Sequence, residues 1–182
     1  MNARNVIRNW CKIEKNQKIV RCPLAHIRVR PTALIIKDDS ILFIEYDDNG
    51  LHYNLPGGGA EPSETIKEAL IREAYEEACI DIEVGPLALN FEFAPHKQLG
   101  NYDTSGRHGL HLIFECSVKE GSKPRLPEVP DPNQSAVKWI RIDEIDSVLL
   151  IPNIQEQIKD YIRNRRSIEL IEDHTLKPLK II

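Results

Sequence analysis

The chain has 182 residues, of which 41% are hydrophobic and 29% charged, a composition typical of one globular domain with short extensions. Its net charge of −4 argues against the basic surface that most nucleic-acid-binding proteins need. No apolar run approaches the roughly 20 residues that cross a bilayer, and the first residues do not form a signal peptide, so we expect a cytoplasmic protein.

The first half of the chain is rich in strand signals. Two β-rich runs, residues 26–36 and 41–46, flank a polar turn and predict a hairpin. Asn49-Gly50 marks a second turn, and apolar residues then alternate with polar ones over residues 51–55. Residues 1–25 carry no pattern that assigns them to an element, and we treat them as an extension.

A glycine-rich loop, residues 56–59, precedes a helix that we predict over residues 62–78. Proline is tolerated in the first turn of a helix, so Pro62 marks the predicted start, and Glu64 complements the N-terminal dipole. The helix carries an apolar stripe at helical spacing: Ile66, Ala69, Leu70, Ala74 and Ala78.

The second half alternates strands with polar loops and then forms a helix. Ile80, Ile82 and Val84 alternate with acids, and another strand candidate covers residues 87–93. Strands are also predicted over residues 110–118 and 136–142, and an amphipathic helix follows Pro152. The tail over residues 167–182 either adds a strand or lies across the surface. Strands with interspersed helices in one chain predict an α/β or α+β sandwich.

Three glutamates of the predicted helix, Glu73, Glu76 and Glu77, fall on one face at the border of the apolar stripe. Like charges at this spacing repel, and partly buried carboxylates tend to take up protons unless a cation neutralises them. Arg72 offsets one of them, and Mg²⁺ or Mn²⁺ would offset the others, because these ions prefer hard oxygen ligands. The alternative interpretation is a solvated acidic helix face.

The spacing of Gly58, Glu64 and the run Arg72–Glu77 resembles the Nudix box, written G-x5-E-x7-R-E-U-x-E-E-x-G-U. One position differs, because Cys79 stands where the box has glycine, at a helix end where glycine eases a left-handed turn. The resemblance implies a Nudix-like α/β/α sandwich with a mixed central sheet over residues 26–163, followed by a C-terminal extension over residues 164–182.

The resemblance also implies an activity, which is divalent-metal-dependent hydrolysis of a nucleoside diphosphate linked to another moiety, by water attack at phosphorus. Mg²⁺ is the implied cofactor, with Mn²⁺ as a substitute. Pro95, fifteen residues after Ile80, is similar to ADP-ribose-type members and ranks ADP-ribose and nucleotide sugars ahead of nucleoside triphosphates. The competing hypothesis is a non-catalytic nucleotide-sensing module, against which the intact set of box acids argues.

Roles for individual residues follow from the same resemblance. The implied metal ligands are helix carboxylates and one loop carbonyl: Glu73, Glu76, Glu77 and Gly58. Glu73 would be either a ligand or the base that activates water, with Arg72 orienting it and Glu64 supporting the site electrostatically. The implied cofactor-binding loop consists of three glycines: Gly57, Gly58 and Gly59.

Many family members take a further acid from a later loop, for which the candidates are Glu115, Glu128 and Asp131. His111 and Cys116 alternate faces on one predicted strand, so packing or substrate stacking is expected there in place of a zinc site. The expected partner is a small nucleotide, with no nucleic acid and no membrane. The two extensions are predicted to build a homodimer interface or to shape the substrate cleft.

Overall fold

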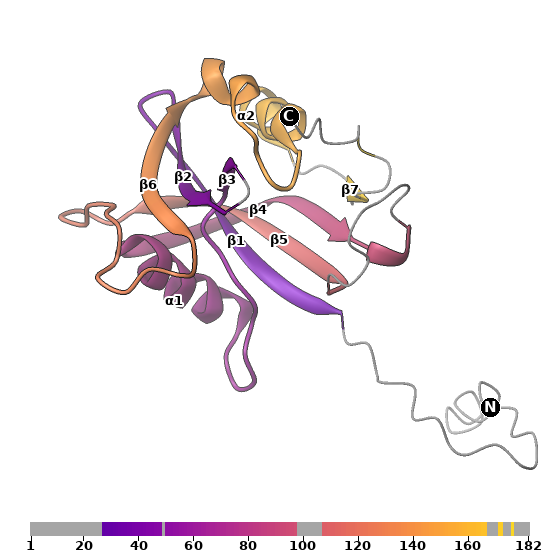
Figure 1. Cartoon of the computed structure of the whole chain (residues 1–182), viewed down its shortest axis with the longest axis horizontal. Coiled ribbons are helices and arrows are strands. Elements are labelled where there is room, and N and C mark those ends of the chain that lie inside the picture. The colour runs from indigo at the N-terminus through magenta and orange to yellow at the C-terminus, as the bar shows by residue number, and fades with distance from the viewer. Residues whose placement is uncertain (1–26, 49, 98–106, 167–170, 173–175, 177–182) are drawn as a thin grey trace, which may run out of the picture.

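The computed structural model describes residues 27–48, 50–97, 107–166, 171–172 and 176 (Figure 1). The predicted extension over residues 1–25 lies outside the described residues, as does most of the C-terminal one. The described strands are β1 (Arg28–Lys37), β2 (Ser40–Asp47), β3 (Leu51–Asn54), β4 (Ile82–Phe93), β5 (Gly109–Val118), β6 (Gln134–Arg141) and β7 (Ile171–Glu172). The described helices are α1 (Ile66–Ala78), α2 (Gln155–Asn164) and the short 3₁₀ helices η3 (Pro95–Lys97) and η4 (Ile142–Ser147).

The described strands form one mixed sheet. Its order is β3-β2-β1-β5-β4-β7, and β6 pairs with β2 off this path. Strands β1 and β5 are parallel, whereas the pairs β1–β2, β2–β3, β2–β6 and β4–β5 are antiparallel. The predicted hairpins and the mixed central sheet are therefore confirmed.

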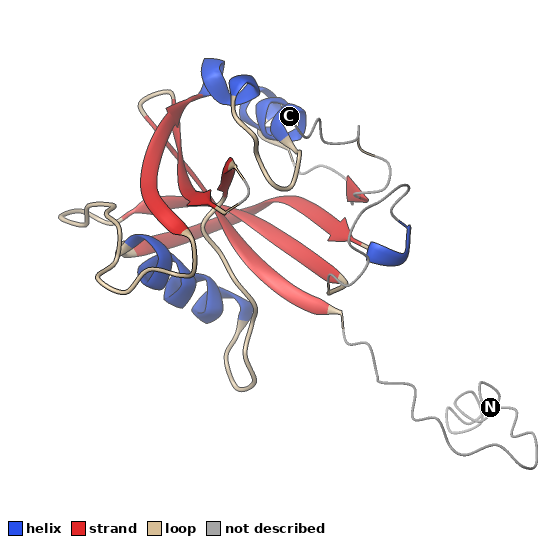
Figure 2. Ribbon diagram, in the orientation of Figure 1, coloured by secondary structure: helices blue, strands red, loops and turns tan. Residues whose placement is uncertain are grey.

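Two apolar clusters lie on opposite faces of this sheet. Because side chains alternate along a strand, Ala33 and Ile35 of β1 pack in the cluster that contains Leu70 of α1. Leu34, between them, packs in the cluster that contains Ile158 of α2. Figure 2 shows the two helices on either side of the sheet, which confirms the predicted α/β/α sandwich.

The sheet opens between β1 and β2, and this opening positions the glycine loop. The two strands pair only where residues 36–37 face residues 40–41. Beyond that point the loop runs beside β1, where the Ala33 amide donates to the Pro56 carbonyl at 2.7 Å and the Ala60 amide donates to the Val29 carbonyl at 2.9 Å. The loop is thereby held between β1 and the start of α1.

The predicted start of the first helix was wrong by several residues. Helix α1 begins at Ile66, with Thr65 as its N-cap in a capping box with Glu68, whose carboxylate accepts the Thr65 amide at 2.7 Å. Ser63 has a φ of 74°, which a helix cannot accommodate. The capping box supplies two hydrogen bonds to the helix terminus, and these outweigh the tolerance of the first turn for proline.

Two strands differ from their predicted bounds. Strand β4 begins at Ile82 and joins the alternating residues there to the candidate over residues 87–93, and its pairing with β5 shifts register on both sides of Leu87. An irregularity of this kind hides the two-residue period of a strand. Strand β6 begins at Gln134, and the tail contributes the two residues of β7, which pair with β4. No helix in the described residues is long and apolar enough to cross a membrane.

Helix α1 ends at a non-glycine residue in a left-handed conformation. Cys79 has φ 54° and ψ 36°, and its amide donates to the Tyr75 carbonyl at 2.8 Å. A Cβ atom makes this conformation costly, so Cys79→Gly should raise the free energy of unfolding by about 0.5–1 kcal/mol. Urea denaturation checks this, with Cys79→Ala as the control for loss of the thiol. A glycine variant no more stable than the alanine variant would contradict it.

Candidate active site

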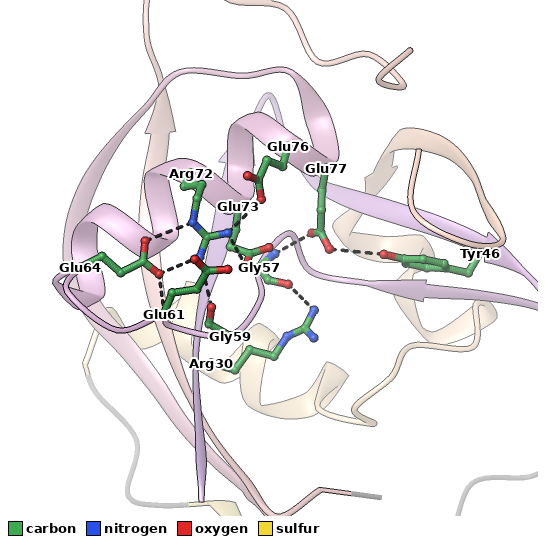
Figure 3. Close-up of polar contacts among 10 residues, drawn as sticks. All are labelled: Arg30, Tyr46, Gly57, Gly59, Glu61, Glu64, Arg72, Glu73, Glu76 and Glu77. Carbon is green, nitrogen blue, oxygen red and sulfur yellow. Dashed lines mark hydrogen bonds and ion pairs between the residues drawn. The ribbon is translucent and has the colours of Figure 1, made fainter. Parts of the chain in front are cut away.

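The glycine loop lies between the acids of α1 and an arginine of β1 (Figure 3). On one side, the Gly57 amide donates to Glu77 Oε2 at 2.8 Å. On the other side, Arg30 Nη2 donates to the Gly57 carbonyl. A Cβ atom at Gly57 would overlap the β1 backbone, and one at Gly58 would overlap the carboxylate of Glu73. Glycine is therefore required at Gly57 by the β1 backbone, whereas a side chain at Gly58 would have to displace the Glu73 carboxylate.

Glu77 is a buried carboxylate with few partners. Its side chain accepts from the Gly57 amide and, at 3.4 Å, from the Tyr46 hydroxyl, and no described lysine or arginine forms an ion pair with it. Burial, together with the negative charges of Glu73 and Asp131, raises the pKa of Glu77 to about 7. A cation bound beside this group would restore its charged form.

The remaining acids are gathered by Arg72, whose guanidinium lies among them. It binds both oxygens of Glu64, at 2.7 and 3.1 Å, and donates from Nη1 to Glu73 and Glu76 at 2.9 Å each. A further bond joins Nη2 to the Gly59 carbonyl at 3.2 Å. The hydrogen bonds from Arg72 lower the pKa of Glu64. Arg72 therefore fixes the geometry of three carboxylates and of the loop.

The predicted acidic face of the helix is divided between two environments. Glu77 points into the protein, at 5% exposure, toward Gly57. Glu76 lies at the solvent edge, with 55% of its side chain exposed, and Glu73 lies between them at 13%. The expectation that all three sit at the border of the buried stripe holds for Glu73 and was wrong for the other two.

The donor chemistry of the site fits a divalent cation. In the described part of the chain, no group of three or more His, Cys, Asp or Glu side chains stands in metal-binding geometry, and Arg72 forms ion pairs with Glu73 and Glu76. Mg²⁺ does not require such a cage, since it binds through one or two carboxylates together with water and substrate phosphates. A buried carboxylate beside backbone carbonyls is a suitable anchor of this kind.

The three candidates for a late-loop acid lie in different places. Glu115 accepts from the Tyr161 hydroxyl and from Arg165, each at 2.6 Å, and so lies on the α2 side of the sheet, away from α1. Glu128 is exposed. Asp131 is the one of the three whose charge acts on Glu77.

A cavity of about 310 Å³ adjoins the glycine loop on the α2 side of the sheet. Among its lining residues are the following: Arg30, Thr32, Asn54, Leu55, Phe91, Phe93, His111, Ile113 and Asn153. Sequence patterns predicted packing or substrate stacking at His111. They did not predict the cavity, because its lining comes from β1, β3, β4, β5 and the loops after β3 and before α2. His111 meets Phe91 edge to face, with ring centroids 5.1 Å apart.

His111 is kept neutral by its surroundings. Burial, followed by the positive charges of Arg30 and Arg28, lowers the pKa of His111 to about 3, from an ordinary value of 6.5. Between these two values the unfolded chain binds a proton that the native protein does not. The contribution of His111 to stability is therefore complete above pH 6.5 and is lost as the pH falls toward 3.

Replacing His111 by glutamine should consequently flatten the fall in unfolding free energy from about pH 6.5 to about pH 4.5. Urea denaturation at a series of pH values measures this slope. His96→Gln, at an exposed histidine of η3, provides the control and should keep the wild-type slope. Equal slopes for the two variants would contradict the assignment of a buried, neutral His111.

Comparison with known proteins gives a consistent result. A family model described as "NUDIX domain" matches residues 27–164. A MutT-like protein of Streptomyces ambofaciens is 29% identical over 130 residues, which make up 71% of this chain and 72% of that protein. A NUDIX hydrolase from Nitrosomonas europaea is 24% identical, with a TM-score of 0.59 over 79% of this chain and 94% of that one. An ADP-ribose pyrophosphatase from Streptococcus suis is 20% identical, with a TM-score of 0.57 over 81% of this chain and 98% of that one.

The family model spans most of the chain, so the chain belongs to the NUDIX domain family. The predicted enzyme class, a Nudix hydrolase, is thereby confirmed, together with the fold. Nudix hydrolases generally use divalent metal ions and act on small nucleotide substrates.

Proposed function

We propose that the chain is a Mg²⁺-dependent pyrophosphohydrolase that cleaves a nucleoside diphosphate linked to another moiety, with ADP-ribose or a nucleotide sugar as its substrate. The observation that carries this proposal is the buried Glu77 carboxylate, 2.8 Å from the Gly57 amide and with no ion-paired lysine or arginine among the described residues. The charge of Arg30 offsets only part of the cost of burying this carboxylate, since burial still raises its pKa, and a divalent ion at the loop would offset the rest.

The cavity beside the loop supports a nucleoside-containing substrate. Its volume of about 310 Å³ falls at the lower end of the range for small-molecule sites. The aromatic ring of Phe91 and the neutral imidazole of His111 offer stacking and hydrogen bonding to a base. Arg30 and Thr32 belong both to the cavity and to the contacts of Gly57, so a ligand in the cavity would extend toward the acids of α1.

The ion would be held by Glu76, Glu77 and the Gly58 carbonyl, and Glu73 would serve as a further ligand or as the base. When bound, a divalent ion supplies neutralisation of phosphoryl charge and a lower pKa for attacking water. Asp131 is the best placed of the candidates for an additional acid, because its charge already acts on Glu77.

Arg72 would position the base. Its bond to Glu73 Oε1 fixes that carboxylate and leaves the second oxygen to accept a proton from water, which the general-base role requires. Glu64 holds the guanidinium from the other side through both of its oxygens, so that Arg72 cannot rotate away from Glu73. The water proton would pass to Glu73, and the water oxygen would form the new bond to phosphorus. The bond from that phosphorus to the bridging oxygen would break, and the other monophosphate would leave with the bridging oxygen.

The experiment that tests the proposal is product analysis with ADP-ribose, nucleotide sugars, dinucleotides and nucleoside triphosphates, each with Mg²⁺, with Mn²⁺ and with EDTA. We expect metal-dependent release of nucleoside monophosphate, fastest from ADP-ribose or a nucleotide sugar. Preference for a triphosphate would keep the hydrolase and overturn the substrate class. Absence of turnover with every compound, together with tight nucleotide binding, would favour a nucleotide-sensing module.

A further inference from the structure

Two arginines of β1, Arg28 and Arg30, form no ion pair with an acid in the described part of the chain. They are two residues apart on one strand, so their side chains lie on the same face of the sheet. Arg30 donates a hydrogen bond to the Gly57 carbonyl, and the Arg28 guanidinium lies against Gly59. Both cations therefore border the glycine loop on the side of the cavity.

The strand pairing places residues of β5 and β4 beside Arg30, in a line that leads into the cavity. Arg30 is the partner of His111 on β5, and His111 is the partner of Phe91 on β4. Arg28 and Arg30 both act electrostatically on His111. A ligand whose base stacks at His111 would consequently carry its phosphates along Arg30 and Arg28 and over the loop.

The acids of α1 lie across the loop from Arg30, as Figure 3 shows for Glu77 and Glu73. A phosphate placed over the loop would have anions on one side and guanidinium groups on the other. A guanidinium that donates to a backbone carbonyl binds phosphoryl oxygens more strongly, because it can form two parallel charge-assisted hydrogen bonds with them.

We propose that Arg28 and Arg30 form a clamp that binds the diphosphate of the substrate across the glycine loop from the α1 acids, with Arg30 leaving the Gly57 carbonyl to do so. This inference rests on the proposed function for its substrate class, but its test uses only the diphosphate group. The competing explanation is structural, namely that Arg30 merely supports the loop through Gly57.

The test is calorimetric titration of the full chain with inorganic diphosphate in the presence of EDTA, so that no metal contributes. Charge-assisted hydrogen bonds to Arg28 and Arg30 are strong enough that each glutamine variant should bind about tenfold more weakly. Arg30→Lys keeps the charge but loses the two parallel hydrogen bonds, so its affinity for diphosphate should lie between those of wild type and Arg30→Gln. Arg141→Gln, at an exposed arginine paired with Asp143, should bind as wild type does.

A wild-type protein that does not bind diphosphate, or variants that bind it equally well, would overturn the clamp. Thermal melting of the same variants distinguishes the clamp from the structural explanation, because the latter predicts lower stability with unchanged affinity for diphosphate. Turnover is measured independently. If the chain hydrolyses substrate but the variants bind diphosphate as tightly as wild type, only the clamp is refuted. If diphosphate binding depends on the two arginines but no substrate is turned over, only the proposed hydrolysis is refuted.

Discussion

Replacing Glu77 by glutamine should lower Mg²⁺-dependent turnover by about a thousandfold, because a metal ligand supplies several kcal/mol of transition-state stabilisation. Glutamine has the same shape, and its carbonyl oxygen can still accept the Gly57 amide. The variant should therefore fold normally and should not be less stable than wild type, because a neutral group costs less to bury. Initial rates with Mg²⁺ and thermal melting with EDTA measure the two effects separately.

The matched control for this variant is Glu83→Gln, at an exposed acid of β4 that carries no role in the site. It should leave turnover unchanged. A Glu77 variant that retains more than about a tenth of wild-type turnover would show that Glu77 is not a ligand, since such a loss corresponds to less than about 1.4 kcal/mol.

Removing the Arg72 side chain should affect both stability and turnover. In Arg72→Met, three carboxylates lose their shared partner, and the Gly59 carbonyl loses a donor. Loss of these charge-assisted bonds at a partly buried site should lower the unfolding free energy by about 1–3 kcal/mol. Turnover should fall by about a hundredfold or more, because Glu73 is no longer held in position.

A double variant distinguishes this network from simple loss of a charged residue. Adding Glu64→Gln to Arg72→Met removes one of the repelling charges, so the two changes should cost less stability together than the sum of their separate costs. Arg125→Met, at an exposed arginine, provides the control and should behave as wild type. Strict additivity of the two changes would contradict the network, and an unchanged rate in Arg72→Met would contradict its positioning role.

Local patterns in the sequence accounted for much of the fold. The hairpins, the helix that ends at Ala78 and the strand over residues 110–118 follow from periodicities that short segments carry by themselves. The box spacing indicated the loop glycines and the α1 acids together, because a helix places residues at fixed angles. The start of α1 was missed because two helix-start signals competed, and the capping box at Thr65 determines the helix start.

Other features depend on contacts between distant segments. The sequence could not show that Glu77 turns inward to Gly57 while Glu76 remains at the solvent edge, since both lie on the predicted acidic face. The cavity and the pair formed by Arg28 and Arg30 arise only when β1, β4 and β5 lie side by side. Such sites depend on which strands pair, and β1 pairs with β5, a strand far from it in the sequence.

The most direct test of the proposed chemistry is hydrolysis of the best substrate in ¹⁸O-labelled water, with the products followed by mass spectrometry. Attack of water at phosphorus predicts two monophosphate products from ADP-ribose, with one labelled oxygen on the phosphoryl group of one of them and no reaction in EDTA. Label on a sugar carbon, release of inorganic phosphate as the first product, or equal rates without metal would contradict a Nudix pyrophosphohydrolase mechanism for this chain.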